Sequence, residues 1–261
     1  MSIWVLLVLC VVQGLTEFLP VSSSGHLLFV EQVFGVSENL LLINLFLHLA
    51  TLLAVVCVYR KVLWGLVKKP FQPLMYKLVI ATAVSVVFAF AYKMLDIDEV
   101  VTKFYGLCFL ITAGLLFVTH KFQTKCAVIR SGEMTYKNAL LVGLVQGLAV
   151  LPGISRSGST ISAMILTGND ENKSAEFSFL LSIPIIVGGF VLELFEVSDF
   201  SALFESVSVW MCLAMFVVTF LVAMLSLRLT IRFLKDKKFK WFSIYVFIIG
   251  VIVTILNLFV W

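Results

Sequence analysis

The chain contains 261 residues, of which 61% are hydrophobic and only 13% are charged, and its mean hydropathy is +1.10. Because roughly a quarter of the residues in a soluble domain are charged, this composition excludes an ordinary soluble protein. We expect a single integral membrane domain over residues 1–261, with an all-α fold and no nucleic-acid partner.

Six apolar segments are long enough to cross a bilayer as helices, which takes about 20 residues. They cover residues 39–60, 74–94, 103–120, 174–194, 207–228 and 241–260. Each is predicted to be a spanning helix.

Two further apolar regions, residues 3–19 and 138–151, end in breaks rich in Pro, Ser and Gly, followed by short helical stretches near 24–34 and 158–167. Irregular backbone at membrane depth is tolerated where it is buried in protein or lines a wet cavity. The pattern therefore predicts two re-entrant helix–loop–helix hairpins and about ten helices in all.

Charges in the loops give the orientation. Basic residues dominate residues 60–77, 121–137 and 228–240, whereas acids gather at 96–99 and 193–205. Cytoplasmic loops carry the excess of Lys and Arg in membrane proteins. The basic loops are therefore predicted to be cytoplasmic, and the assignment alternates correctly through all six spans.

The broken stretches are related to each other. QGLTEFLPVSSSGH at residues 13–26 aligns without a gap with QGLAVLPGISRSGS at residues 146–159, an offset of 133. The chain then divides into two halves, about 1–125 and 134–261, and each half holds one hairpin and three spans. Because three is odd, the second half is expected to be inverted relative to the first. In transporters with this plan the site lies at the repeat interface.

At the equivalent positions the two loops differ in their chemistry. In the alignment, Glu17 corresponds to Val150, Ser23 to Arg156 and His26 to Ser159. Helix N-termini bind anions through free N–H groups, and the arginine fork suits phosphate oxygens. Two helix starts and one arginine thus predict a site for a strongly anionic group such as a diphosphate.

The ionisable residues need a reason to lie at membrane depth, where they are costly and usually functional. Glu17 could hold a divalent cation or act as a general base, and His26 could act as acid, base or nucleophile. Alternatively, Glu17 and Arg156 form only a buried salt bridge. His48, on a span, is either a packing residue or part of the site.

The two long motifs, together with EFSFLLSIP from residue 176 and LHLATLLAV from residue 47, closely resemble the bacitracin-resistance (BacA) family of undecaprenyl-diphosphate phosphatases. The resemblance spans the whole chain. It implies a multi-pass protein of the bacterial inner membrane that removes the terminal phosphate of undecaprenyl diphosphate, recycles the carrier lipid for peptidoglycan synthesis, and confers bacitracin resistance. Its site is expected to open toward the periplasm.

The resemblance also assigns roles. It places the catalytic groups at Glu17, Ser23, His26 and Arg156, with Glu17 beside a Mg²⁺ or Ca²⁺ cofactor. Substrate binding is expected from the remaining polar and glycine positions of the two loops, namely Gln13, Ser22, Ser24, Gly25, Ser155, Ser157, Gly158 and Thr160. Many members have Glu where this chain has Gln13, so this chain lacks the second carboxylate that those members carry.

The route of hydrolysis stays open at this point. His26 could activate a serine, with Ser23 the first choice, or attack directly, or a metal-bound water could attack. The expected partners are the lipid diphosphate and the membrane, with a homodimer left open. The rival hypothesis is a transporter that flips a lipid phosphate, which would need an anion site but no nucleophile.

Overall fold

The computed structural model describes residues 2–36, 41–95, 97–125, 134–196 and 208–260. In these ranges every regular element is a helix. In chain order they are α1 (Ile3–Thr16), α2 (Ser23–Val33), α3 (Leu41–Lys68), α4 (Pro73–Leu95), α5 (Asp98–Lys125), α6 (Tyr136–Leu148), α7 (Arg156–Leu166), α8 (Glu171–Glu196), α10 (Val209–Lys235) and α11 (Phe239–Phe259). The predicted all-α membrane fold is confirmed.

Six of these helices are long and apolar enough to cross a membrane: α3, α4, α5, α8, α10 and α11. They are the six spans predicted from hydropathy. Helix α1 has only 14 residues, which is about 21 Å of helix at 1.5 Å per residue. A hydrocarbon core is about 30 Å thick, so α1 is too short to cross it.

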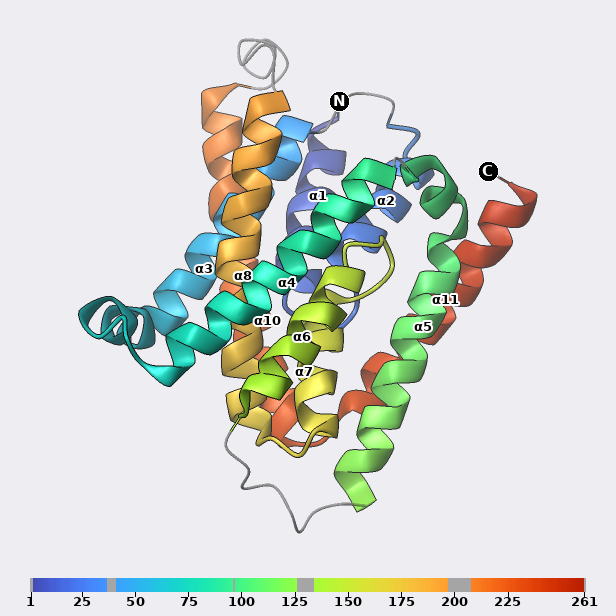
Figure 1. Cartoon of the computed structure of the whole chain (residues 1–261). Coiled ribbons are helices and arrows are strands. Elements are labelled where there is room, and N and C mark those ends of the chain that lie inside the picture. Colours follow the sequence, from blue (N-terminus) through green and yellow to red (C-terminus); the bar gives the residue numbers. More distant parts are fainter. Residues whose placement is uncertain (1, 37–40, 96, 126–133, 197–207, 261) are drawn as a thin grey trace.

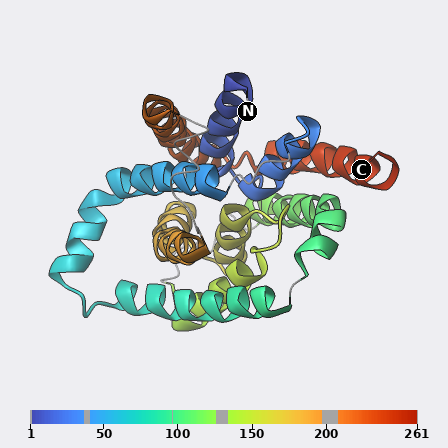
Figure 2. The ribbon, with the colours of Figure 1, turned by 90° about the horizontal axis from the view of Figure 1, so that it is seen from above.

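The short helices form the two predicted hairpins. Helices α1 and α2 descend from and return to one end of the bundle, whereas α6 and α7 enter from the opposite end, and the two tips meet between the ends (Figure 1). Seen along the bundle, α3, α4 and α5 run around α7 and α8 (Figure 2). The irregular backbone of both tips is thereby enclosed by helices.

Helix packing follows the same two-fold plan. Helix α1 packs on α10, and its counterpart α6 packs on α4, while α3 pairs with α8 and α5 pairs with α11. Exchanging the halves, α1 for α6, α3 for α8, α4 for α10 and α5 for α11, leaves these pairs unchanged. This is the packing expected of an inverted repeat; the repeat boundaries themselves stay a prediction.

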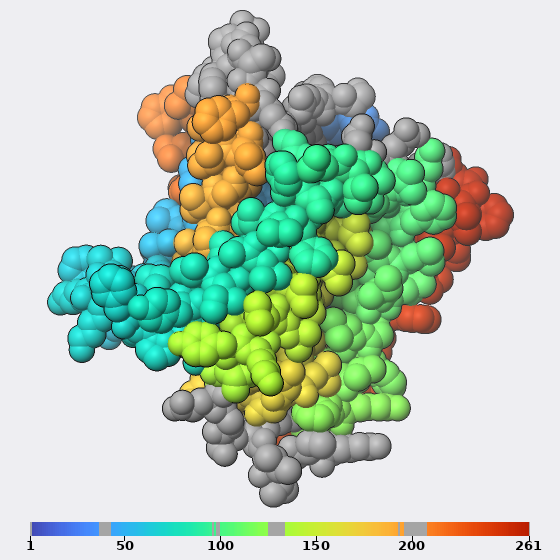
Figure 3. Space-filling model, in the orientation of Figure 1, coloured from blue at the N-terminus to red at the C-terminus, as the bar shows by residue number. Residues whose placement is uncertain are grey.

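Glycines allow the hairpins to approach the spanning helices closely. A Cβ at Gly14 of α1 would lie 2.8 Å from the Cβ of Val222 in α10, and one at Gly143 of α6 would lie 2.7 Å from the carbonyl oxygen of Ala81 in α4. Small residues drive helix packing in membranes because they let backbones come together. The contact between α4 and α6 extends across the face seen in Figure 3.

Each tip is also tied to a spanning helix of the other half. Thr230 of α10 donates to the carbonyl of Phe18 at 3.2 Å. Thr112 of α5 donates to the carbonyl of Gly153 at 2.9 Å and accepts from the amide of Ser155 at 3.1 Å. The backbone groups freed by the helix breaks are thus satisfied inside the protein, and the tips are held in place.

Candidate active site

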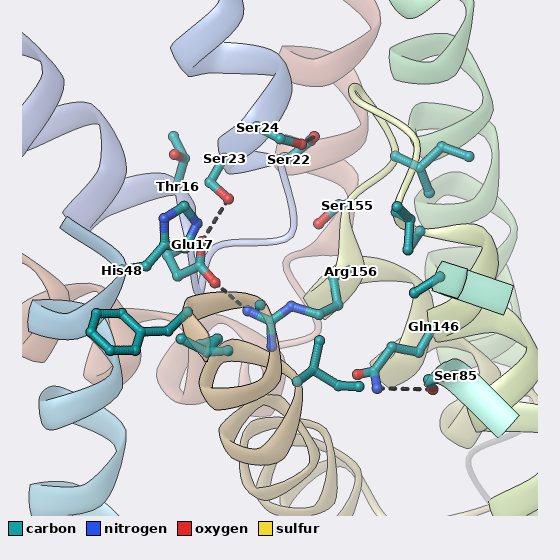
Figure 4. Close-up of a pocket in the computed structure, with 18 of the residues that line it drawn as sticks. Thr16, Glu17, Ser22, Ser23, Ser24, His48, Ser85, Gln146, Ser155 and Arg156 are labelled. Carbon is teal, nitrogen blue, oxygen red and sulfur yellow. Dashed lines mark hydrogen bonds and ion pairs between the residues drawn. The ribbon is translucent and has the colours of Figure 1, made fainter. Parts of the chain in front are cut away.

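The two hairpin tips border a cavity of about 300 Å³ that is lined by both polar and apolar side chains (Figure 4). The first hairpin contributes Thr16, Glu17, Ser22, Ser23 and Ser24, and the second contributes Gln146, Ala149, Val150, Ile154, Ser155 and Arg156. Spanning helices complete the walls with Leu45 and His48 of α3, Ser85 and Ala89 of α4, and Ile185, Ile186, Gly189 and Phe190 of α8. The cavity is a joint product of both halves.

Glu17 is the centre of the hydrogen-bond network in this cavity. Its side chain is only 3% exposed and forms an ion pair, through Oε1, with Nη2 of Arg156. Its other oxygen, Oε2, accepts from the hydroxyl of Ser23 at 2.6 Å and from Nε2 of Gln13 at 3.1 Å. One carboxylate therefore joins a cation from the second hairpin to a hydroxyl from the first.

Helices α2 and α7, the second helix of each hairpin, both start at the cavity, and both are capped in the same way. Ser22, before α2, accepts from the amide of Gly25 at 3.4 Å, and Ser155, before α7, accepts from the amide of Gly158 at 3.0 Å. A serine cap satisfies one of the free amides of a helix start. The remaining amides and the helix dipole favour an anion. The N-termini of α2 and α7 therefore both border the cavity where such an anion would bind.

Arg156 is placed to receive such an anion. It is the first residue of α7 and its side chain is 18% exposed. Within the described part of the chain, the only hydrogen-bond partner of its guanidinium is Glu17. The other guanidinium N–H groups remain available, and the arginine fork binds phosphate oxygens in pairs.

His26 does not share this cavity, contrary to the expectation that it would converge with Glu17 and Arg156. It is buried, its Nδ1 lies 2.7 Å from the carbonyl oxygen of Ser22, and its Nε2 lies 2.9 Å from the hydroxyl of Tyr245. Its ring stacks on Tyr245 and meets Phe109 edge-on. Both ring nitrogens are therefore engaged: Nδ1 bonds within the start of α2, and Nε2 joins α2 to α11, while the ring edge contact joins α2 to α5.

Five of the eight residues expected to bind substrate also lie outside the cavity lining; Ser22, Ser24 and Ser155 lie within it. Gln13 supports Glu17, and Ser157 donates to the carbonyl of Leu19 at 3.1 Å. Thr160 bonds to Ser178 at 2.6 Å. The glycines serve close packing: a Cβ at Gly25 would lie 2.9 Å from the Cα of Gly153, and one at Gly158 would lie 3.1 Å from Pro20.

Four polar lining residues, Thr16, His48, Ser85 and Gln146, were not assigned to the site from the sequence. His48 was left open between packing and function, and it lines the cavity next to Glu17 (Figure 4). Gln146 donates to Ser85 at 3.1 Å, while its own Oε1 is buried without a hydrogen-bond partner. The equivalence of Gln146 to Gln13 in the repeat was the available signal; Ser85 had none.

A cation site made by the protein alone is not present among the described residues, where no three His, Cys, Asp or Glu side chains cluster. Glu17 is the only acid in the lining, and beside it Oε1 of Gln13 is buried without a partner. Mg²⁺ is commonly held by one or two carboxylates together with the phosphates of the substrate. The oxygens present fit that mode of binding.

Comparison with known proteins agrees with these features. The family described as "Bacitracin resistance protein BacA" matches residues 6–252. The chain is 38% identical over 258 residues to an undecaprenyl-diphosphatase of Carboxydothermus hydrogenoformans, covering 96% of both chains. It is 36% identical to undecaprenyl-diphosphatase 4 of Bacillus thuringiensis over 253 residues, and 36% identical to an undecaprenyl-diphosphatase of Treponema denticola over 267 residues, with at least 95% of each chain covered. This chain belongs to the BacA family.

Proposed function

We propose that the protein is a phosphatase that removes the terminal phosphate of undecaprenyl diphosphate, the substrate named for its relatives. The observation that carries the proposal is the contact of the Ser23 hydroxyl with a buried carboxylate, 2.6 Å from Oε2 of Glu17. A hydroxyl bonded to a base is an activated nucleophile. It lies in a cavity bounded by an arginine and two helix N-termini, which suits a diphosphate.

In the proposed reaction, Arg156 and the amides at the starts of α2 and α7 bind the terminal phosphate. The oxygen of Ser23 attacks the phosphorus atom and passes its proton to Glu17. The anhydride bond breaks, and its electron pair stays with the lipid monophosphate. Charge stabilisation of this kind dominates phosphoryl transfer.

A divalent cation is part of this proposal. Glu17 and the phosphates of the substrate would hold it. When bound, it would neutralise charge on the diphosphate and orient the leaving group. The charge of Glu17 is already paired with Arg156. This supports a site in which the cation arrives together with the diphosphate.

The protein is proposed to lie in the bacterial inner membrane with the cavity open to the periplasm. Ser85 lies at the middle of α4 and Ala89 in its C-terminal half, and residues 185–190 lie in the C-terminal half of α8. Both helices run into the acidic loops, which the positive-inside rule assigns to the outside. The wall formed by Ile185, Ile186 and Phe190 would receive the first prenyl units. A homodimer stays a prediction, and light scattering in detergent tests it.

The transporter alternative is not favoured. A carrier needs an anion site but gains nothing from a serine bonded to a carboxylate, and the relatives are named as diphosphatases.

The test is phosphate release from undecaprenyl diphosphate by the purified protein with Mg²⁺. We expect steady release by the wild type and a loss of at least about 100-fold in Ser23→Ala. Ser208→Ala, an exposed serine at the start of α10, is the matched control and should keep full activity. Equal release by Ser23→Ala would refute the nucleophile, and no release by the wild type would refute the function.

A further inference from the structure

The protein has two histidines near the hairpin tips, and the structure separates their chemistry. His26 has both ring nitrogens engaged and lies outside the cavity. His48, in the third turn of the spanning helix α3, lines the cavity with Glu17 and Ser23. Figure 4 shows its ring directed toward the same space as those two side chains.

The protonation of the His48 ring follows from its one hydrogen bond. Nδ1 lies 2.8 Å from the carbonyl oxygen of Asn44, one turn earlier in α3. A carbonyl oxygen can only accept, so Nδ1 must carry the proton. In the neutral ring Nε2 is then a free acceptor, and among the described residues no hydrogen bond occupies it. The helix thus presents a lone pair to the cavity.

The charges around His48 come from few groups. Glu17 is close enough to interact with a charge on the ring, and Arg156 lies on the far side of Glu17. Glu31 of α2 contacts Asn44, one turn from His48. The packed stretches 3–16 of α1, 177–192 of α8 and 209–227 of α10 contain no charged residue. Glu17 is already committed to Arg156 and Ser23, so a second proton needs another acceptor.

Resting on the proposed phosphatase activity, we propose that His48 is a catalytic residue, the general base for the water that releases phosphate from Ser23. In this step the water oxygen bonds to phosphorus and gives one proton to Nε2 of His48. The bond between phosphorus and the Ser23 oxygen breaks, its electron pair returns to that oxygen, and Glu17 gives back the proton it took in the first step. Inorganic phosphate leaves with the second proton of the water, and His48 loses its proton to solvent.

The use of Glu17 as the base of the first step and His48 as the base of the second step has a chemical reason. A lipid monophosphate is a good leaving group, because the second pKa of a phosphate monoester is about 6, so the first step needs a base for Ser23 but no strong acid. Water attacking a phosphoserine needs a base of its own. Positioned bases of this kind contribute about 10²- to 10⁴-fold in rate.

The experiment compares His48→Gln with the wild type. Glutamine keeps a polar group at the position but cannot accept a proton at neutral pH. We expect the steady-state rate to fall by about 100-fold or more, and rapid acid quenching to trap phosphate on Ser23, detected by mass spectrometry, with one equivalent of lipid monophosphate released in a burst.

Two other histidine variants serve as comparisons. His120→Gln, whose Nδ1 contacts the carbonyl of Lys237 at 3.2 Å, should keep the wild-type rate. His26→Gln should lower the thermal unfolding midpoint without trapping phosphate on Ser23. A His48→Gln protein with the wild-type rate, or a slow one that traps no phosphate on Ser23, would overturn the role of His48. Neither result touches the proposed function, which fails only if the wild type releases no phosphate.

Discussion

The pair formed by Glu17 and Arg156 can be tested by a double-mutant cycle that separates stability from chemistry. In Arg156→Met the carboxylate of Glu17, 3% exposed, would be left buried without its cation. Breaking a buried pair from one side costs about 3–5 kcal/mol. The variant should therefore unfold at a clearly lower temperature, and its phosphate release should fall by about 10²- to 10³-fold, the usual effect of removing a donor to the reacting group.

The double variant Glu17→Gln/Arg156→Met removes both charges at once. Replacing a buried pair by uncharged groups of similar volume is often neutral for stability, so the unfolding midpoint should return close to that of the wild type. Activity should stay lost, because the base for Ser23 and the clamp for phosphate are both gone. Arg60→Met is the control, since Arg60 is exposed and, among the described residues, donates to the carbonyl of Cys57.

Intrinsic fluorescence during heating in detergent reports stability, and phosphate release from undecaprenyl diphosphate reports activity. If the double variant recovers both stability and activity, the pair is a structural salt bridge and the reasoning is refuted. If it recovers stability alone, the two charges serve the reaction.

Three further changes probe the tips. Gly25→Ala should destabilise the fold by about 1–3 kcal/mol through overpacking, because a Cβ there would lie 2.6 Å from an aromatic carbon of α5; Gly114→Ala, with open space around it, should leave the unfolding midpoint unchanged. Ser155→Ala removes the cap of α7 and should cost about 1 kcal/mol, seen as a small drop in the same midpoint. Gln13→Glu places a second carboxylate one turn from Glu17; activity should then depend more steeply on Mg²⁺, and an unchanged titration would contradict the proposed ligands.

Much of the fold was predictable because hydropathy and loop charge act over whole segments. Six apolar runs predicted six spanning helices, and the Pro, Ser and Gly breaks at 17–25 and 149–158 predicted the hairpins. The repeat also predicted a site at the interface of the two halves, and the contact of Glu17 with Arg156 agrees with that. These inferences needed only the lengths of the apolar segments and the repeat that relates the two halves of the sequence.

The direction of single side chains was not predictable in this way. His26 follows Ser23 by three residues in α2, yet the carbonyl of Ser22 and the hydroxyl of Tyr245 hold its ring away from the cavity. Tyr245 is more than 200 residues distant in sequence, so no local pattern reports the contact. His48 likewise depends on how α3 is rotated against α1 and α8, which is set by packing over its whole length.

The most direct test of the central claim is a structure of the Glu17→Gln protein with a polyprenyl methylene-diphosphonate, which cannot be hydrolysed. The account predicts that the terminal phosphonate lies between the two tips, within hydrogen-bond distance of the Ser23 hydroxyl and the Arg156 guanidinium, with the lipid chain leaving past residues 185–190. A diphosphonate bound elsewhere, with Ser23 and Arg156 free of contact to it, would contradict the account.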